Sequence, residues 1–184
     1  MISEIFRWTP RQFKKAAAAG WFEGSKAELL GGIVFKKTTK PPHMIAVHRL
    51  VEALEGLASE PIWVVTKEDR VELGSWLPLP DSAILRGPLE TYSKRLPRSK
   101  DILLIVEVSD TTYAKDRGRK YRRYAASRIP FYWIVDLNRR VVEIHSSPAG
   151  RSYHTVDFFE AKDDALVVLN GRCVGHIPVR DILP

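Results

Sequence analysis

The chain has 184 residues, of which 45% are apolar and 28% charged, and this composition excludes collagen-like, low-complexity and wholly disordered proteins. Its one cysteine, Cys173, excludes an internal disulfide, and no apolar run approaches the roughly 20 residues that cross a bilayer, so we expect one cytoplasmic domain over residues 1–184 with no membrane partner. Lys and Arg outnumber Asp and Glu by 29 to 22, which gives a net charge of +7 and favours a polyanionic partner.

Turn residues and apolar spacing define the elements in the first half of the chain. Thr9, Pro10 and Gly20 mark a short helix between them, and a helical stripe of apolar residues predicts a second helix over 43–57. Short runs rich in branched and apolar residues predict strands at 28–30, 33–35, 62–66, 71–73 and 80–85.

The second half predicts a sheet crossed by one basic helix. After a loop over 88–100, residues 101–108 form the most apolar strand, a pattern typical of a strand covered on both faces. A helix is expected over 112–127, a hairpin over 131–135 and 141–145, and edge strands at 153–159 and 165–169. The order of elements favours an α/β or α+β domain, with a mixed central sheet flanked by helices and β-hairpin strands toward the C-terminus.

The positive charge is concentrated in the middle of the chain. Residues 115–128 carry seven positive side chains and one negative, and Lys94, Arg95, Arg98 and Lys100 form a second basic cluster. Such a run often belongs to a helix face that only water contacts, and the alternative is a surface that faces an anion.

Two charged residues stand where burial is expected. Glu107 follows the apolar run 102–106, where a carboxylate is costly unless it is paired, protonated or bound to a metal; the alternative is a strand end that faces solvent. Lys120 borders the inward face that Tyr121 and Tyr124 form on the basic helix, so its amine is expected to meet a counter-charge. The alternative for Lys120 is a stem that runs along apolar surface to reach water.

Four other polar residues carry weaker signals. Asp81 after a proline is typical of a turn, and Glu28 next to a Leu-Leu pair could lie on the surface. His43 at a helix start is more often structural than a ligand, and Asp116 in the first turn of the basic helix favours the helix dipole. The chain has no P-loop, GxGxxG, GxSxG or HExxH motif, so no nucleotide cofactor is expected.

Taken in order, Glu28, Asp81, Glu107 and Lys120 are similar to the acidic residues and lysine of the PD-(D/E)xK nuclease superfamily. The resemblance becomes more specific over 107–136, which resembles the Uma family of restriction endonucleases. The matching residues there are Glu107, Val108, Ser109, Thr111, Asp116, Lys120, Tyr124, Pro130, Tyr132, Trp133, Val135 and Asp136. The segments AELLGGIV and PPHMIAVHRLVEAL also resemble the family, and the likeness covers roughly residues 10 to 180.

The resemblance implies a restriction-endonuclease-like fold and a DNA endonuclease that depends on Mg²⁺ or Mn²⁺. By this resemblance Asp81, Glu107 and the carbonyl of Val108 would hold the ion, Lys120 would orient the attacking water, and Glu28 would tune the ion or the lysine. The basic helix would contact DNA phosphates through Arg117, Arg119, Arg122 and Arg123. Analogy with such nucleases implies a homodimer.

One departure and two alternatives accompany this interpretation. Ser109 stands where the superfamily usually has its lysine, so the resemblance moves that role to Lys120. A nuclease fold without catalysis, acting as a nucleic-acid-binding or interaction domain, is one alternative. A nuclease for RNA or for branched or single-stranded DNA is the other, because a basic patch responds to phosphate charge and not to bases.

Overall fold

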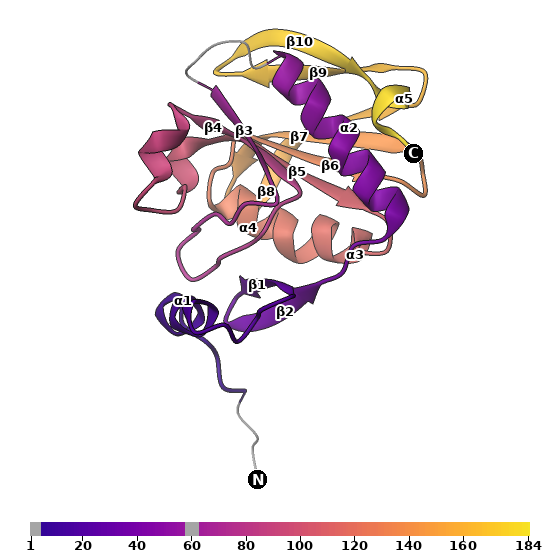
Figure 1. The fold of residues 1–184 in the computed structure, drawn as a ribbon. Helices are drawn as coiled ribbons and strands as arrows, with labels where there is room; N and C mark the ends of the chain where they lie inside the picture. The colour runs from indigo at the N-terminus through magenta and orange to yellow at the C-terminus, as the bar shows by residue number, and fades with distance from the viewer. Residues whose placement is uncertain (1–4, 58–62) are drawn as a thin grey trace.

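The computed structural model describes residues 5–57 and 63–184 (Figure 1). Its centre is a six-stranded sheet in the order β3-β4-β5-β6-β7-β8, in which only β5 and β6 run parallel. The strands are β3 (Trp63–Lys67), β4 (Ser82–Arg86), β5 (Ile102–Ser109), β6 (Phe131–Asp136), β7 (Val141–Ala149) and β8 (Ser152–Glu160). A parallel pair needs a crossover connection, and the basic helical segment between β5 and β6 supplies it.

Both faces of the sheet are covered. On one face lie α2 (Pro41–Leu57), the ribbon of β9 (Asp164–Leu169) and β10 (Arg172–Pro178), and α5 (Val179–Ile182), which together build the larger apolar core. The crossover helix lies on the other face over a core rich in tyrosine. All eight residues of β5 are buried between these layers, as its continuous apolar sequence predicts.

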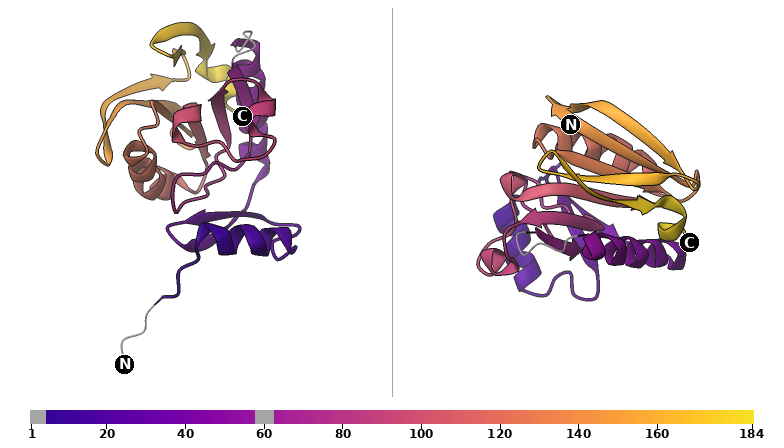
Figure 2. Two further views of the ribbon diagram at one scale, coloured as in Figure 1. Left: turned by 90° about the vertical axis from the view of Figure 1, so that its left-hand side faces the viewer. Right: turned by 90° about the horizontal axis from the view of Figure 1, so that it is seen from above.

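A small third layer closes the side of the crossover helix that faces away from the sheet. It contains α1 (Pro10–Ala18) and the hairpin of β1 (Lys26–Leu30) and β2 (Ile33–Lys37). Figure 1 draws it below the crossover helix, and the left view of Figure 2 shows it as a separate layer below the rest of the molecule. Thr9 caps α1 by exchanging hydrogen bonds with Gln12, and Pro10 occupies the first helical position, which explains why this helix begins where predicted.

The crossover helix contains one wide turn. It begins as α3 (Tyr113–Lys115), passes through a π-helical turn, η3 (Asp116–Lys120), and ends as α4 (Tyr121–Ala126). The predicted helix over 112–127 is therefore confirmed in extent but not in regularity. A π turn is rare and often lies at a functional site, and this one directs the side chains of Asp116 and Lys120 to the interior.

One strand prediction is wrong and another is incomplete. The edge strand expected at 165–169 is confirmed as β9, but it pairs with β10 in a separate ribbon; β10 lacks apolar alternation and was not predicted. Residues 71–73 form only isolated bridges because the chain turns back at Gly74.

The other predicted elements are confirmed with shifts of a few residues, including β8 as an edge strand. The predicted loop over 88–100 contains the short 3₁₀ helix η1 (Leu89–Tyr92) and the start of η2 (Ser99–Asp101). Residue 62, the first of a predicted strand, lies outside the described residues. No helix in the described ranges is long and apolar enough to cross a membrane.

Candidate active site

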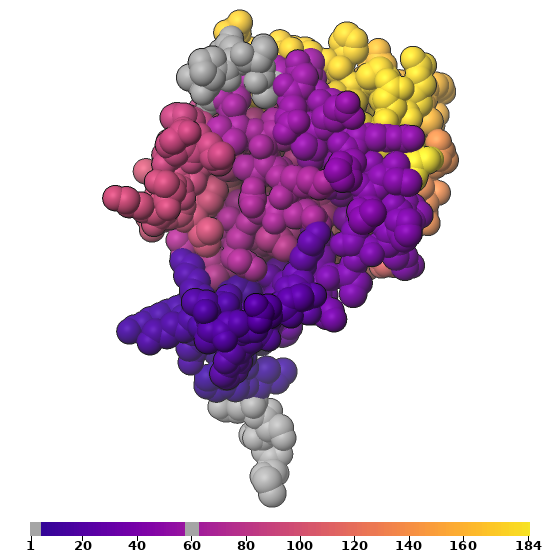
Figure 3. Space-filling view, in the orientation of Figure 1, coloured from indigo at the N-terminus to yellow at the C-terminus, as the bar shows by residue number. Residues whose placement is uncertain are grey.

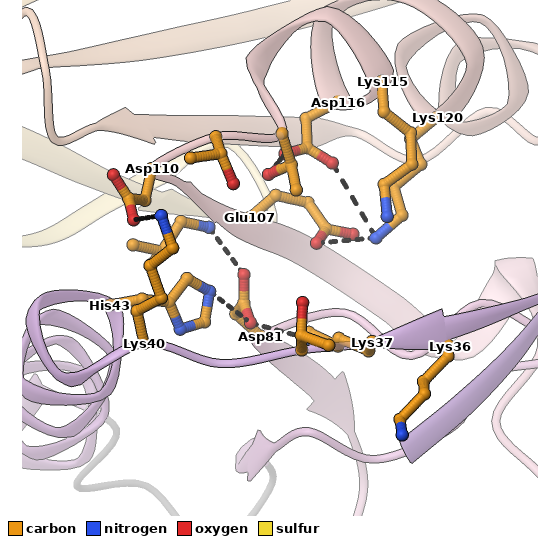
Figure 4. A pocket seen from close by; sticks show the side chains of 14 residues that line it. Lys36, Lys37, Lys40, His43, Asp81, Glu107, Asp110, Lys115, Asp116 and Lys120 are labelled. Carbon is orange, nitrogen blue, oxygen red and sulfur yellow. Dashed lines mark hydrogen bonds and ion pairs between the residues drawn. The ribbon is translucent and has the colours of Figure 1, made fainter. Parts of the chain in front are cut away.

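A cavity of about 80 Å³ opens where β4 begins and β5 ends, between β2 and the start of the crossover helix (Figure 4). Five lysines, four carboxylates and one histidine line it: Lys36, Lys37, Lys40, Lys115, Lys120, Asp81, Glu107, Asp110, Asp116 and His43. The structure thus brings Asp81, Glu107, Val108 and Lys120 to one cavity although they come from three separate segments.

Asp81 lies at the point where the β4–β5 ladder stops. Its Oδ2 accepts a 2.7 Å hydrogen bond from the backbone N–H of Val108, and its Oδ1 lies 2.6 Å from Lys37 Nζ and 3.1 Å from His43 Nε2. Burial alone would raise the pKa of Asp81, but Lys37 and then His43 outweigh burial and hold that pKa below its usual range. Asp81 is therefore an ionised carboxylate fixed by three donors.

Glu107 and Lys120 form a buried ion pair, with 2.8 Å between Oε2 and Nζ. Tyr124 donates its hydroxyl to the other oxygen of Glu107 at 2.7 Å, and Lys120 Nζ also lies 3.3 Å from Glu28 and 3.9 Å from Asp116. Each side chain of the pair is only 2% exposed. The alternatives of a solvent-facing glutamate and of a lysine stem that reaches water are therefore wrong.

The pKa values of Glu107 and Lys120 are both raised above their ordinary values, but for different reasons. Burial raises the pKa of Glu107 to about 7, although Lys120 opposes the shift. Burial would lower the pKa of Lys120, but the carboxylates around it, Glu107 first, outweigh burial and raise that pKa above its ordinary value. Lys120 is therefore a permanent ammonium that donates hydrogen bonds and neutralises negative charge.

Glu28 lies behind the cavity wall. Its side chain is completely buried, its Oε1 is 3.0 Å from Lys115 Nζ, and its Oε2 accepts from the backbone N–H of Leu79 at 3.3 Å. Burial would raise the pKa of Glu28, but Lys120 and Lys115 outweigh burial and lower it. Its contacts allow it to position two lysines of the cavity.

Asp116 anchors the π turn to β5. Its Oδ2 accepts from Ser109 Oγ at 2.8 Å and from Thr112 Oγ1 at 2.5 Å, and Tyr132 donates its hydroxyl to the backbone carbonyl of Asp116 at 3.0 Å. The interpretation of Asp116 as a partner of the helix dipole is therefore incomplete. Ser109, at the position where the superfamily usually has its lysine, instead holds the turn that carries Lys120.

The oxygen atoms around the cavity suit a hard divalent ion. In a strand, the N–H and C=O of one residue point to the same side, so the Val108 carbonyl is directed toward Asp81 along with its N–H. No group of three His, Cys, Asp or Glu side chains that could hold an ion alone occurs in residues 5–57 and 63–184. Two carboxylates and a carbonyl would supply part of an oxygen ligand set, which water and phosphate oxygens would have to complete.

Several cavity residues were missed by the sequence interpretation. His43 was interpreted as structural, yet it contacts Asp81, and its Nδ1 is buried without a hydrogen-bond partner among the described residues. Lys36, Lys37 and Lys40 line the cavity from β2 and the turn that follows. The run of lysines just before the Pro-Pro-His segment was the signal that could have indicated them.

The four arginines predicted to contact DNA occupy two places. Arg117 lies 3.4 Å from the buried carboxylate of Glu143, and its guanidinium stacks 4.3 Å above the ring of Tyr121. Arg119, Arg122 and Arg123 line a separate hollow on the outer side of the crossover helix. Their contact with DNA stays a prediction.

With this geometry established, comparisons with known proteins place the chain in a family. The sequence profile of a family described as "Uma2: Putative restriction endonuclease" matches residues 12–172. The chain belongs to the Uma2 family. Among solved structures, this Uma2 chain is similar to a "putative nuclease belonging to DUF820" from Anabaena variabilis, with a TM-score of 0.70, 17% identity, and coverage of 95% of this chain and 97% of that one.

At that identity the likeness shows the fold alone, and it confirms the predicted restriction-endonuclease-like class for this Uma2 chain. The family profile confirms the resemblance that the 107–136 stretch carries. A search of curated proteins found no match.

Proposed function

We propose that this Uma2 protein is a divalent-metal-dependent endonuclease that hydrolyses phosphodiester bonds in DNA. The observation that carries the proposal is the meeting of Asp81, Glu107 and Lys120 in one small cavity, with further lysines around it. Membership of a restriction endonuclease family supports the same reaction class. Phosphodiester hydrolysis requires a positioned water and neutralisation of charge on the phosphate, and these side chains can supply both.

Asp81, Glu107 and the Val108 carbonyl are the residues that would hold Mg²⁺ or Mn²⁺. A bound divalent ion lowers the pKa of a coordinated water and polarises a phosphoryl oxygen. Lys37 Nζ contacts Asp81 Oδ1 at 2.6 Å, so its ammonium group would have to move for an ion to bind that oxygen.

The lysines of the cavity would neutralise the negative charge of the substrate phosphates. The ammonium of Lys120, held by Glu107 and Glu28, would orient the attacking water and offset charge on the pentacovalent phosphate. Lys36 and Lys40 line the cavity from β2 and the turn after it, where they would bind phosphate oxygens next to the scissile bond. Glu28 acts through the lysines that it contacts and is a positioning residue.

Plasmid nicking in Mg²⁺ or Mn²⁺ tests the proposal. Asp81→Asn, Glu107→Gln and Lys120→Met should each reduce cleavage at least about 100-fold, because each removes a group from the reacting centre. Asp157→Asn, on the exposed part of β8, is the matched control and should cleave like wild type. Activity that survives all three substitutions, or survives EDTA, contradicts the proposal.

A nuclease fold without catalysis is the second candidate, and one observation favours it. Lys37 Nζ and His43 both contact Asp81 Oδ1, so cationic or donor groups already satisfy the carboxylate that a metal would use. This candidate predicts DNA binding that is indifferent to Mg²⁺ and unchanged in Asp81→Asn. Metal-dependent cleavage by the wild type would exclude it.

We also propose that two copies act together in the cytoplasm, since cutting both strands of a duplex needs two reaction centres. Sedimentation equilibrium with and without DNA would measure the homodimer. A monomer in both conditions, combined with double-strand cutting, would contradict it.

A further inference from the structure

A second concave surface lies on the outer side of the crossover helix. We call it the arginine hollow; it has a volume of about 510 Å³ and is lined chiefly by Arg7, Arg119, Arg122, Arg123, Arg151 and Trp76. The turn between β1 and β2, from Leu30 to Ile33, forms another side of it. Five guanidinium groups thus come together from the chain before α1, the crossover helix and the turn between β7 and β8.

The cations of the arginine hollow lack anionic partners. Among residues 5–57 and 63–184, none of its five arginines has a carboxylate oxygen within 4.0 Å. By contrast, Arg95, Arg117 and Arg139 elsewhere on the molecule each contact one. Like charges brought together without counter-charge repel one another, and a bound polyanion relieves that repulsion.

Two of these arginines are oriented by the protein itself. Arg7 donates to the carbonyl of Gly31 at 2.8 Å, and Arg123 donates to the carbonyl of Leu73 and lies 5.7 Å over the ring of Trp76. The Nε of Arg123 is buried with no hydrogen-bond partner among the described residues. The hollow therefore combines fixed guanidinium groups with an aromatic ring.

The arginine hollow is joined to the cavity by β2. Ile33 lines the hollow and Lys37 lines the cavity, and a strand rise of about 3.3 Å per residue puts roughly 13 Å between them. Between these ends, the guanidinium of Arg119 lies 5.3 Å over the ring of Phe35. A nucleic acid strand whose scissile phosphate sits at the cavity would reach the hollow within a few nucleotides.

We propose that the arginine hollow binds an unpaired nucleotide of the substrate strand, with guanidinium groups on its phosphates and Trp76 against its base. Cationic grooves that carry an aromatic side chain bind single strands, because the face of an unpaired base is free to stack. The bases inside a duplex are already stacked on one another, so their faces are not free to contact the Trp76 ring. The inference rests on the proposed function, and it names the substrate class as DNA with a single-stranded segment beside the scissile bond.

Fluorescence anisotropy of the full chain in EDTA tests this inference. The probes are a blunt duplex, the same duplex with a single-stranded overhang, and the overhang strand alone. Wild type should bind the overhang duplex about 10-fold more tightly than the blunt one. Trp76→Ala should remove most of that preference and leave blunt-duplex binding nearly unchanged. Arg122→Gln, at an exposed position, should also remove most of the preference, because it weakens binding of the overhang duplex more than binding of the blunt one.

Arg172→Gln is the matched control, because Arg172 is exposed on β10, on the opposite side of the sheet from the β1–β2 hairpin (Figure 1). It should keep the wild-type preference. Equal affinity for blunt and overhang duplexes, or a preference that survives both Trp76→Ala and Arg122→Gln, overturns the inference. Because the assay involves no cleavage, a protein that shows the preference but never cuts DNA contradicts the proposed function alone, and one that cuts without the preference contradicts the hollow alone.

Discussion

The crossover helix contributes residues to both the cavity and the arginine hollow, but the two regions differ in how their positive charge is compensated. In the cavity, Lys120 is buried and contacts the carboxylates of Glu107 and Glu28. In the hollow, none of the five arginines has a carboxylate partner among the described residues. A buried cation must be compensated inside the protein, whereas an exposed group of cations can be compensated by a ligand. The difference separates a buried site whose charges are compensated within the protein from an exposed surface whose charges a ligand can compensate.

The π turn places buried residues of the cavity and exposed residues of the hollow next to one another in the chain. Asp116 and Lys120 begin and end that turn and are both buried, while Arg119, directly before Lys120, faces the hollow. The space-filling view shows the N-terminal layer packed against the lower side of the molecule (Figure 3). Within this layer, β2 contributes residues to both regions, Ile33 to the hollow and Lys37 to the cavity. Single substitutions of charged residues in the cavity and in the hollow test whether the two regions differ in this way.

The largest effect on stability is expected for Lys120→Met. The substitution leaves three buried carboxylates without their shared ammonium group, and breaking a buried ion pair in this way costs about 3–5 kcal/mol of unfolding free energy. Urea unfolding in EDTA measures the loss. A loss below about 1 kcal/mol would mean that water enters the cavity and compensates its charges, as solvent does in the hollow.

Glu107 should make stability depend on pH. An ordinary glutamate releases its proton near 4.5, but burial raises the pKa of Glu107 to about 7, so between these values the folded chain binds more protons than the unfolded chain. The Glu107 contribution to the unfolding free energy therefore falls as pH rises from about 4.5 to 7, by at most about 3 kcal/mol.

Urea unfolding across this pH range, without metal, isolates the effect as the difference between wild type and Glu107→Gln. Other titrating groups contribute to both proteins and cancel in the difference. Parallel pH profiles for the two proteins would show that Glu107 keeps an ordinary pKa.

Removing Lys37 should strengthen metal binding. Its ammonium lies 2.6 Å from Asp81 Oδ1 and repels a divalent ion at the same carboxylate, so Lys37→Met should lower the Kd for Mn²⁺ about 10-fold. Isothermal titration calorimetry gives the Kd, with Lys162→Met on the surface as the control. Weaker binding in Lys37→Met would mean that Lys37 organises the ligands of the ion and does not compete with it.

The smallest effect is expected in the arginine hollow. Arg122→Gln removes an exposed charge that has no carboxylate partner among the described residues, so the unfolding free energy should change by less than about 0.5 kcal/mol. Urea unfolding under the conditions used for Lys120→Met makes the comparison direct. A loss above about 1 kcal/mol would show that the hollow is a structural cluster and would remove the contrast between the two regions.

The sequence predicted the parts of this molecule that depend on local pattern. Continuous apolar residues predicted the fully buried β5, and the misplaced charges of Glu107 and Lys120 indicated a site before any geometry was known. The resemblance of Glu28, Asp81, Glu107 and Lys120, taken in order, to the PD-(D/E)xK superfamily joined them to Asp81. These signals lie in residue type and spacing, which are visible along the chain.

What the sequence could not predict depends on packing between distant segments. Lys37 and His43 reach Asp81 only because the β1–β2 hairpin and α2 meet at the start of β4. The π turn follows from bonds that Asp116 makes to β5 and β6, which helix propensity does not include. The arginine hollow likewise assembles from residues more than a hundred positions apart, Arg7 and Arg151 among them.

We propose that Asp81 and Glu107 together hold a divalent ion, and electron paramagnetic resonance of Mn²⁺ titrated into the protein tests this shared site most directly. Wild type should bind one Mn²⁺ tightly, and Asp81→Asn and Glu107→Gln should each weaken that binding at least about 10-fold, while Asp157→Asn leaves it unchanged. Mn²⁺ binding that is the same in all four proteins would contradict a shared site at these two carboxylates.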